Sequence, residues 1–132
     1  MINRIEIRNF RSIESADVDL AAITIVYGPT SSGKSSLLYA PLVLRNFVLN
    51  PNRQADGYFH FGFMDLGGFE ECVFDHDGKR DITISISHKE ERPESKYSLR
   101  FGKTDGTILL SHGAYQLQAK VAIPYPLNQT FP

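Results

Sequence analysis

The segment from Gly28 to Ser35 constrains this chain more than any other, because its glycines, lysine and serine stand at fixed intervals. It reads Gly-Pro-Thr-Ser-Ser-Gly-Lys-Ser and fits the pattern G-x-x-x-x-G-K-S/T without deviation. The preceding residues, 23–27, are all β-branched or aromatic, which predicts a strand buried on both faces. After the segment, leucines at helical spacing predict a helix over 34–48 with a bend at Pro41. A phosphate-binding loop requires this order of strand, loop and helix.

The residue types of the segment suit a nucleotide with its metal ion. Backbone N–H groups around residues 31–36 are expected to surround the phosphates, helped by the positive end of the helix. Gly33 allows close approach where a Cβ would clash, and Lys34 brings a charge to the β- and γ-phosphates as the predicted catalytic residue. The Ser35 hydroxyl is an oxygen ligand suited to Mg²⁺. The alternative is an ordinary turn rich in glycine and serine. The predicted nucleotide-binding residues of the loop are Gly28, Pro29, Thr30, Ser31, Ser32, Gly33, Lys34, Ser35 and Ser36.

The rest of the chain is patterned as strands. Residues 2–8 alternate between apolar and charged side chains, which predicts a half-buried strand, and 17–20 predict a short second one. Beyond residue 57 the turn signals Asp77-Gly78, Arg92-Pro93 and Asp105-Gly106 separate short β-rich runs. These runs are 70–74, 82–88, 97–101, 107–110 and 116–123. We therefore expect strands, loop and helix in 1–50, followed by an antiparallel β subdomain over 57–123.

Composition excludes several classes of protein. A chain of 132 residues with 42% hydrophobic content and a net charge of -1 suits one folded domain, not a disordered chain or one basic throughout. The single cysteine, Cys72, excludes an intramolecular disulfide and a Cys-rich zinc site. No apolar run approaches the roughly 18 residues that a membrane span needs. We expect a cytoplasmic protein without membrane insertion.

Two stretches of the sequence resemble the N-terminal lobe of ABC-type ATPases. Residues 7–13, Ile-Arg-Asn-Phe-Arg-Ser-Ile, are followed by the loop and by Ser36-Leu37-Leu38, as in the SMC, RecF and double-strand-break-repair ATPases and the predicted AAA/ABC ATPases of prokaryotes. Residues 65–74 also look like the stretch after the first helix in the last group. The resemblance implies an α/β, P-loop NTPase fold in which residues 1–132 are the N-terminal lobe. That lobe would have a mixed sheet, an antiparallel β subdomain and one main P-loop helix.

The resemblance also implies roles for residues outside the loop. Arg11 aligns with a basic residue that approaches the nucleotide, and a surface arginine at the end of a strand is the alternative. Thr30 and Ser31 depart from the usual Asn-Gly, so the backbone cradle is expected without the side-chain contact that asparagine makes. Family members need a glutamine that links Mg²⁺ to the attacking water. Gln129 is the candidate, and Gln116 and Gln118 fit less well because they lie within a strand pattern.

Other motifs of these ATPases are not found in this sequence. It contains no Leu-Ser-Gly-Gly-like signature, no run of four apolar residues ending in Asp-Glu, and no histidine after such a run. We therefore expect the C-terminal lobe to be absent, and ATP hydrolysis to require that lobe from another polypeptide or from a removed remainder. Without it, the strand at 23–27 should leave apolar surface uncovered, through which the chain associates.

Three functions remain open at this point. The first is ATP binding and hydrolysis coupled to DNA- or protein-related conformational work, with the C-terminal lobe, a nucleotide-dependent homodimer and DNA as candidate partners. The second is a nucleotide-dependent dimerising switch with little hydrolysis. The third is a kinase-like phosphotransferase, against which the antiparallel meander after the helix argues.

Overall fold

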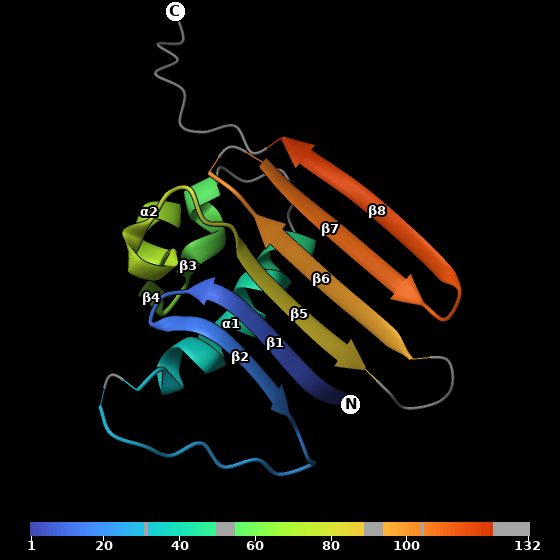
Figure 1. Ribbon diagram of the computed structural model, residues 1–132, viewed down its shortest axis with the longest axis horizontal. Coiled ribbons are helices and arrows are strands. Elements are labelled where there is room, and N and C mark those ends of the chain that lie inside the picture. The colour runs from blue at the N-terminus through green and yellow to red at the C-terminus, as the bar shows by residue number, and fades with distance from the viewer. Residues whose placement is uncertain (31, 50–54, 89–93, 104, 123–132) are drawn as a thin grey trace, which may run out of the picture.

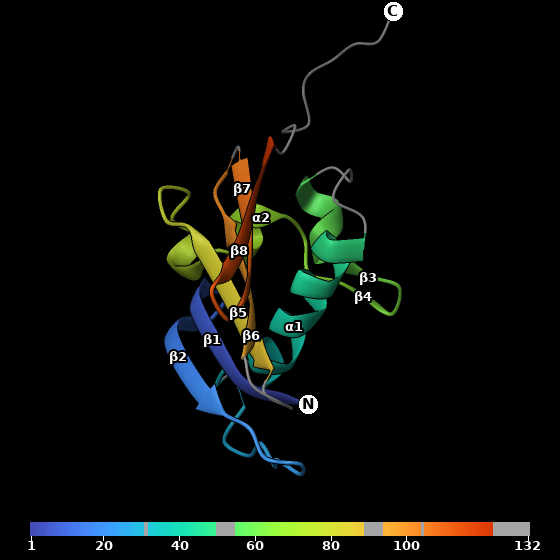
Figure 2. The same ribbon diagram turned by 90° about the vertical axis from the view of Figure 1, so that its right-hand side faces the viewer.

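An antiparallel sheet of six strands is the frame of the computed structural model, which describes residues 1–30, 32–49, 55–88, 94–103 and 105–122 (Figures 1 and 2). The strand order is β2-β1-β5-β6-β7-β8. The strands are β1 (Ile2–Phe10), β2 (Ile13–Asp19), β5 (Ile82–His88), β6 (Ser95–Phe101), β7 (Asp105–His112) and β8 (Tyr115–Ala122). Along the chain, β2 is followed by several further elements before β5 begins. They are α1 (Lys34–Leu49), η1 (Ala55–Phe59), β3 (His60–Phe61), β4 (Met64–Asp65), α2 (Phe69–Cys72) and η2 (Phe74–His76). Within the described part of the chain, no helix is both long and apolar enough to cross a membrane.

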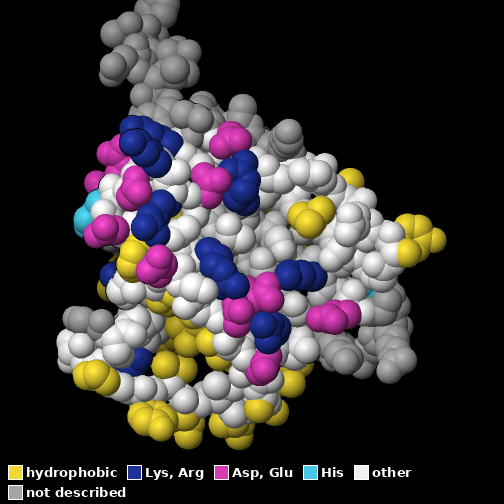
Figure 3. Space-filling view, in the orientation of Figure 1, with side chains coloured by type: hydrophobic (Ala, Val, Ile, Leu, Met, Phe, Trp, Pro, Cys, Tyr) yellow, Lys and Arg dark blue, Asp and Glu magenta, His cyan; other side chains and the backbone are white. Residues whose placement is uncertain are grey.

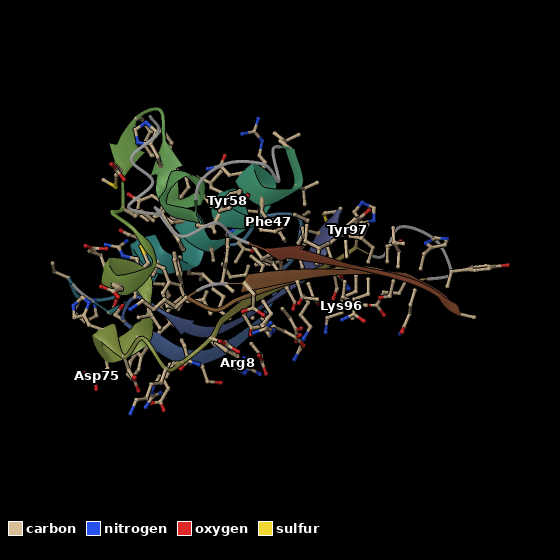
Figure 4. The ribbon with its side chains drawn as sticks, turned by 90° about the horizontal axis from the view of Figure 1, so that it is seen from above. Arg8, Phe47, Tyr58, Asp75, Lys96 and Tyr97 are labelled. Atoms are coloured by element: carbon tan, nitrogen blue, oxygen red, sulfur yellow. The ribbon has the colours of Figure 1, made fainter. Side chains whose placement is uncertain are left out.

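The inner face of the sheet carries the core. In β1 the buried Ile5 and Ile7 point inward, as the alternation of residues 2–8 predicts, and β1 pairs with both β2 and β5. The helix α1 covers this face with a buried stripe at helical spacing, made of Ala40, Val43, Leu44 and Phe47. The Phe47 ring meets Phe101 edge-on at 5.3 Å and Tyr58 at 4.8 Å, between the two layers (Figure 4).

The helix α1 runs through Pro41 as one element. A proline inside a helix removes a backbone donor and crowds the preceding turn, at a cost of about 3 kcal/mol. Buried residues of α1 lie on both sides of Pro41 and pack on the same sheet, and this packing offsets the cost.

On the outer face of the sheet, positively and negatively charged side chains lie next to each other (Figure 3). Its ion pairs cross between strands: Arg4 to Asp19 at 2.8 Å, Arg8 to Asp17 at 2.6 Å, Lys96 to Glu6 at 2.8 Å, and Arg100 to Asp81 at 2.7 Å. Figure 4 shows Arg8 and Lys96 on the side of the sheet opposite Phe47 and Tyr58. The hydrogen bond from Lys96 holds the pKa of the Glu6 carboxyl below its usual value. Because its charges are paired, this face is not a uniformly basic surface.

The strand predicted at 23–27 is not a strand of either sheet, and this prediction is wrong for the described chain. The segment runs as an unpaired coil from the end of β2 (Figure 1), and Ile23, Ile25 and Tyr27 are 84%, 79% and 89% exposed. A strand buried on both faces needs neighbours at its edges and a layer on each side. The described residues supply neither. The predicted mixed sheet is also corrected, because all five pairings in the six-stranded sheet are antiparallel.

The meander is confirmed for β5 to β8, whose ranges lie within a few residues of the predicted runs. The predicted strand at 70–74 is wrong, because these residues form α2 and the start of η2. The Glu71 side chain accepts a hydrogen bond from the Gly68 N–H at 3.0 Å and caps α2. Phe69 and Cys72 are both buried, so one helical turn covers the core here. The apolar run here, Cys72 to Phe74, is too short to distinguish a strand from such a turn.

The lowered pKa of the Glu6 carboxyl predicts how the free energy of unfolding depends on pH. The charged Glu6 contributes stability that is present above the usual glutamate pKa, about 4.3, and is lost as the pH falls through the folded-state pKa. Glu6→Gln should therefore reduce the free energy of unfolding near pH 7 by up to about 1 kcal/mol, and by less near pH 3. Urea unfolding across this pH range measures it, with the exposed Glu94→Gln as the control. Equal losses at both pH values would contradict the assignment.

Candidate functional site: a phosphate pocket at the start of α1

The first turn of α1 presents backbone N–H groups that the helix itself does not use. The Leu37 N–H donates to the Gly33 carbonyl at 2.9 Å and closes the first turn, so the N–H groups of Lys34, Ser35 and Ser36 precede the helical ladder. No acidic side chain lies in this turn. The positive end of the helix dipole is therefore open to an anion.

Gly33 joins the loop to the turn between β1 and β2. Its φ of +96° is a conformation that residues with side chains rarely adopt. A Cβ there would lie 3.3 Å from Ile13 Cγ1 and 3.5 Å from Ser12 Oγ. Glycine therefore lets the loop pack directly on the hairpin turn, which brings Ser12 and its neighbour Arg11 to the start of α1.

The Lys34 side chain folds back over its own loop. Its Nζ donates to the carbonyl of Gly28 and to that of Pro29, the second at 3.3 Å. These carbonyl contacts are of the kind that phosphate oxygens can replace, since both offer acceptors to an ammonium group. Ser35 is exposed, whereas Ser36 is 4% exposed, so Ser35 has the more accessible hydroxyl.

Arg11 approaches the same place from the sheet. Its φ is +54°, and its backbone N–H donates to the Cys72 carbonyl at 2.6 Å. The guanidinium carbon lies 5.5 Å from the centroid of the Tyr39 ring. Its Nη1 is buried and has no hydrogen-bond partner within the described chain. Arg11 is thus anchored through its backbone and an aromatic ring, and its Nη1 group is not used by another part of the described chain.

These groups line one pocket of about 370 Å³. Its lining comprises Arg11, Ser12, Thr30, Gly33, Lys34, Ser35 and Ser36. Gly28, Pro29 and Ser32 line an adjoining groove of about 490 Å³ against β2, which Gly33 and Lys34 also line. Ser12 and Tyr39 were not predicted as site residues. The sequence held a signal for each, because Ser12 follows Arg11 in one turn and Tyr39 lies one helical turn after Ser35.

The predicted glutamines and Ser31 differ in whether the structure describes them. Ser31 and Gln129 lie outside the described residues. Gln116 and Gln118 lie on β8, at the opposite edge of the sheet from β2 (Figure 1). The strand order therefore separates both from the pocket.

The donor set fits a metal ion that arrives with a nucleotide. Ser35 offers an exposed hydroxyl at the pocket, and among the described residues no group of three or more His, Cys, Asp or Glu could hold a metal ion. One hydroxyl can ligate Mg²⁺ whose remaining ligands come from phosphates and water. Ser35 would hold the ion, and Mg²⁺ when bound would neutralise charge on the phosphates.

Comparison with known proteins assigns the chain to a family. Residues 1–122 match the family described as AAA ATPase domain, and a search of curated proteins gives no match. The family match spans the hairpin turn, the loop and α1, and confirms the resemblance to AAA/ABC-type P-loop ATPases. Membership suggests nucleotide binding and ATPase activity, typically with Mg²⁺. The chain belongs to the AAA ATPase domain family.

Proposed function

We propose that the pocket at the start of α1 binds ATP with Mg²⁺, and that the chain is the N-terminal lobe of an ATPase related to the SMC and RecF proteins. The observation that carries this proposal is the meeting of Arg11, Lys34 and the first-turn N–H groups at one pocket, within a loop of the required pattern. ATP hydrolysis would be coupled to conformational work on DNA or protein in the cytoplasm.

Each group of the pocket has its own role in binding a polyphosphate. The N–H groups of the first turn donate to phosphate oxygens along the helix axis. Lys34 exchanges its carbonyl contacts with Gly28 and Pro29 for phosphate oxygens, and Arg11 supplies the second positive charge. The Ser35 hydroxyl orients the metal ion. This charge stabilisation and positioning are what phosphoryl transfer requires of a protein, apart from a group that orients water.

We propose that a C-terminal lobe supplies that missing group. The exposed segment 23–27 supports this, because its apolar side chains are unpaired and uncovered within the described chain. A lobe that adds strands beside this segment would bury them and bring carboxylates toward the pocket. A second copy of the chain, in a nucleotide-dependent dimer, would then cover the phosphates from the other side.

A nucleotide-dependent dimerising switch is the second candidate function. It is favoured by the pocket lining, which among the described residues has two cationic side chains and no carboxylate. Such a site can bind a polyphosphate without a general base. Measured turnover in the completed domain distinguishes a switch from an ATPase.

Lys34→Ala tests nucleotide binding. The substitution removes the mobile positive charge and should weaken Mg²⁺-ATP binding more than tenfold, equivalent to about 1.4 kcal/mol or more. Calorimetric titration of both proteins measures the affinity. Lys79→Ala, at an exposed lysine in the turn before β5, is the control and should bind like wild type. Equal affinities for Lys34→Ala and wild type would show that the loop does not bind phosphate.

A phosphate-release assay tests whether the chain needs a further lobe to hydrolyse ATP. With Mg²⁺ and ATP, the 132-residue chain should hydrolyse at close to the uncatalysed rate, because loss of one preorganised group typically costs a factor of about a hundred to a thousand. Adding a C-terminal lobe, in cis or in trans, should restore turnover. Robust, Lys34-dependent turnover by the monomeric chain alone would contradict the proposal.

The exposed segment predicts self-association of the chain. Ile23→Glu with Ile25→Glu should shift sedimentation-equilibrium profiles toward monomer, because charges cannot enter an apolar contact without a large desolvation cost. Leu117→Glu, at an apolar side chain on β8 that is 63% exposed, is the control. If Leu117→Glu shifts the profile and the double variant does not, the chain associates through β8 instead.

A further inference from the structure

We propose that Tyr39 is a positioning residue whose ring holds the Arg11 guanidinium at the phosphate pocket before any nucleotide binds. The inference rests on the proposed function, because it names how one of the pocket's two cations is held in place. It concerns a side chain that does not itself line the pocket.

The geometry links the ring to the pocket in two steps. Tyr39 follows Ser35 by four residues, so it lies one turn further along the same side of α1. The Arg11 guanidinium carbon is 5.5 Å from the ring centroid, within the roughly 6 Å at which a cation is attracted by an aromatic face. Arg11 lines the pocket together with Ser35 and Lys34. The ring therefore contacts a cation that itself lines the pocket.

Arg11 differs from the arginines of the outer face in what it pairs with. Arg4, Arg8, Arg80 and Arg100 each contact a carboxylate, at 2.6 to 3.4 Å. Within the described chain no carboxylate pairs with Arg11, and its buried Nη1 has no hydrogen-bond partner. An aromatic ring attracts a guanidinium without using its N–H donors. Within the described chain, Arg11 thus keeps a charge that no carboxylate neutralises and one guanidinium nitrogen, Nη1, that makes no hydrogen bond.

The Tyr39 ring is itself supported from behind. Its centroid lies 5.7 Å from that of Phe61 and 6.5 Å from that of Phe63, both in the segment of the β3–β4 hairpin. These contacts restrict where the ring can move, so the guanidinium meets a fixed surface. Among the residues that the structure describes, the Tyr39 hydroxyl makes no hydrogen bond that takes part in this support, and phenylalanine should replace tyrosine without loss.

A double-mutant cycle with Mg²⁺-ATP as the probe tests the proposal. Arg11→Ala and Tyr39→Leu should each weaken binding about three- to tenfold, and the double variant should bind no more weakly than Arg11→Ala alone. Tyr39→Phe should retain wild-type affinity. Inorganic tripolyphosphate should show the same pattern, since the contact is with phosphate. Additive losses in the double variant, or a loss seen with ATP only, would overturn the proposal.

A second series of variants at position 39 tests the proposal even if the Tyr39→Leu variant does not fold. Phenylalanines with increasing fluorine substitution at position 39 preserve the shape of the ring and withdraw its electron density, so affinity should fall stepwise along the series. Unchanged affinity across the series would mean that the ring acts by shape alone. Lys34→Ala separates the two proposals. If it binds like wild type, the proposed function fails, whereas if it alone loses affinity, only the role of Tyr39 fails.

Discussion

The packing of α1 across the inner face of the antiparallel sheet is the interaction on which the rest of the structure depends. The buried stripe from Ala40 to Phe47 lies on Ile7, Ile84 and Phe101, with aromatic contacts at 4.8 to 5.3 Å. This packing carries the helix through Pro41 and sets the direction of its axis. Because Gly33 then seats the start of α1 on the β1–β2 turn, the core decides where the pocket forms.

The positively charged side chains of the outer face and those of the pocket have different kinds of partner. On the outer face, Arg4, Arg8, Lys96 and Arg100 each pair with a carboxylate from another segment of the chain. At the pocket, Lys34 contacts backbone carbonyls and Arg11 contacts an aromatic ring, so neither charge is cancelled by a carboxylate. Neutralised charges contribute modestly to stability, whereas uncancelled charges near a helix N-terminus attract polyanions. The same residue types therefore contribute to stability on the outer face and, in the proposed function, to binding at the pocket.

The residues of segment 23–27 are of the types found in a buried strand, yet the segment is exposed like a loop. Side chains such as Ile25 and Tyr27 gain stability only when a neighbouring layer removes them from water. Their exposure, beside a pocket whose described lining contains no carboxylate, supports the proposal of a further lobe. In that proposal, the further lobe supplies both the covering layer and the groups that act on water.

The sequence by itself determined the local features: the loop at 28–35, the helix after it, the alternation of β1 and the meander from β5 to β8. Each depends on periodicity or spacing, which a single segment contains. It misassigned 23–27, whose apolar residues suit a strand but form an unpaired coil, and 70–74, where the short run Cys72 to Phe74 suits either a strand or a helical turn. Only the tertiary structure decided that Arg11 meets Tyr39 and that Ser12 lines the pocket. Those contacts join residues that are far apart in the chain, and they follow from how the helix packs on the sheet.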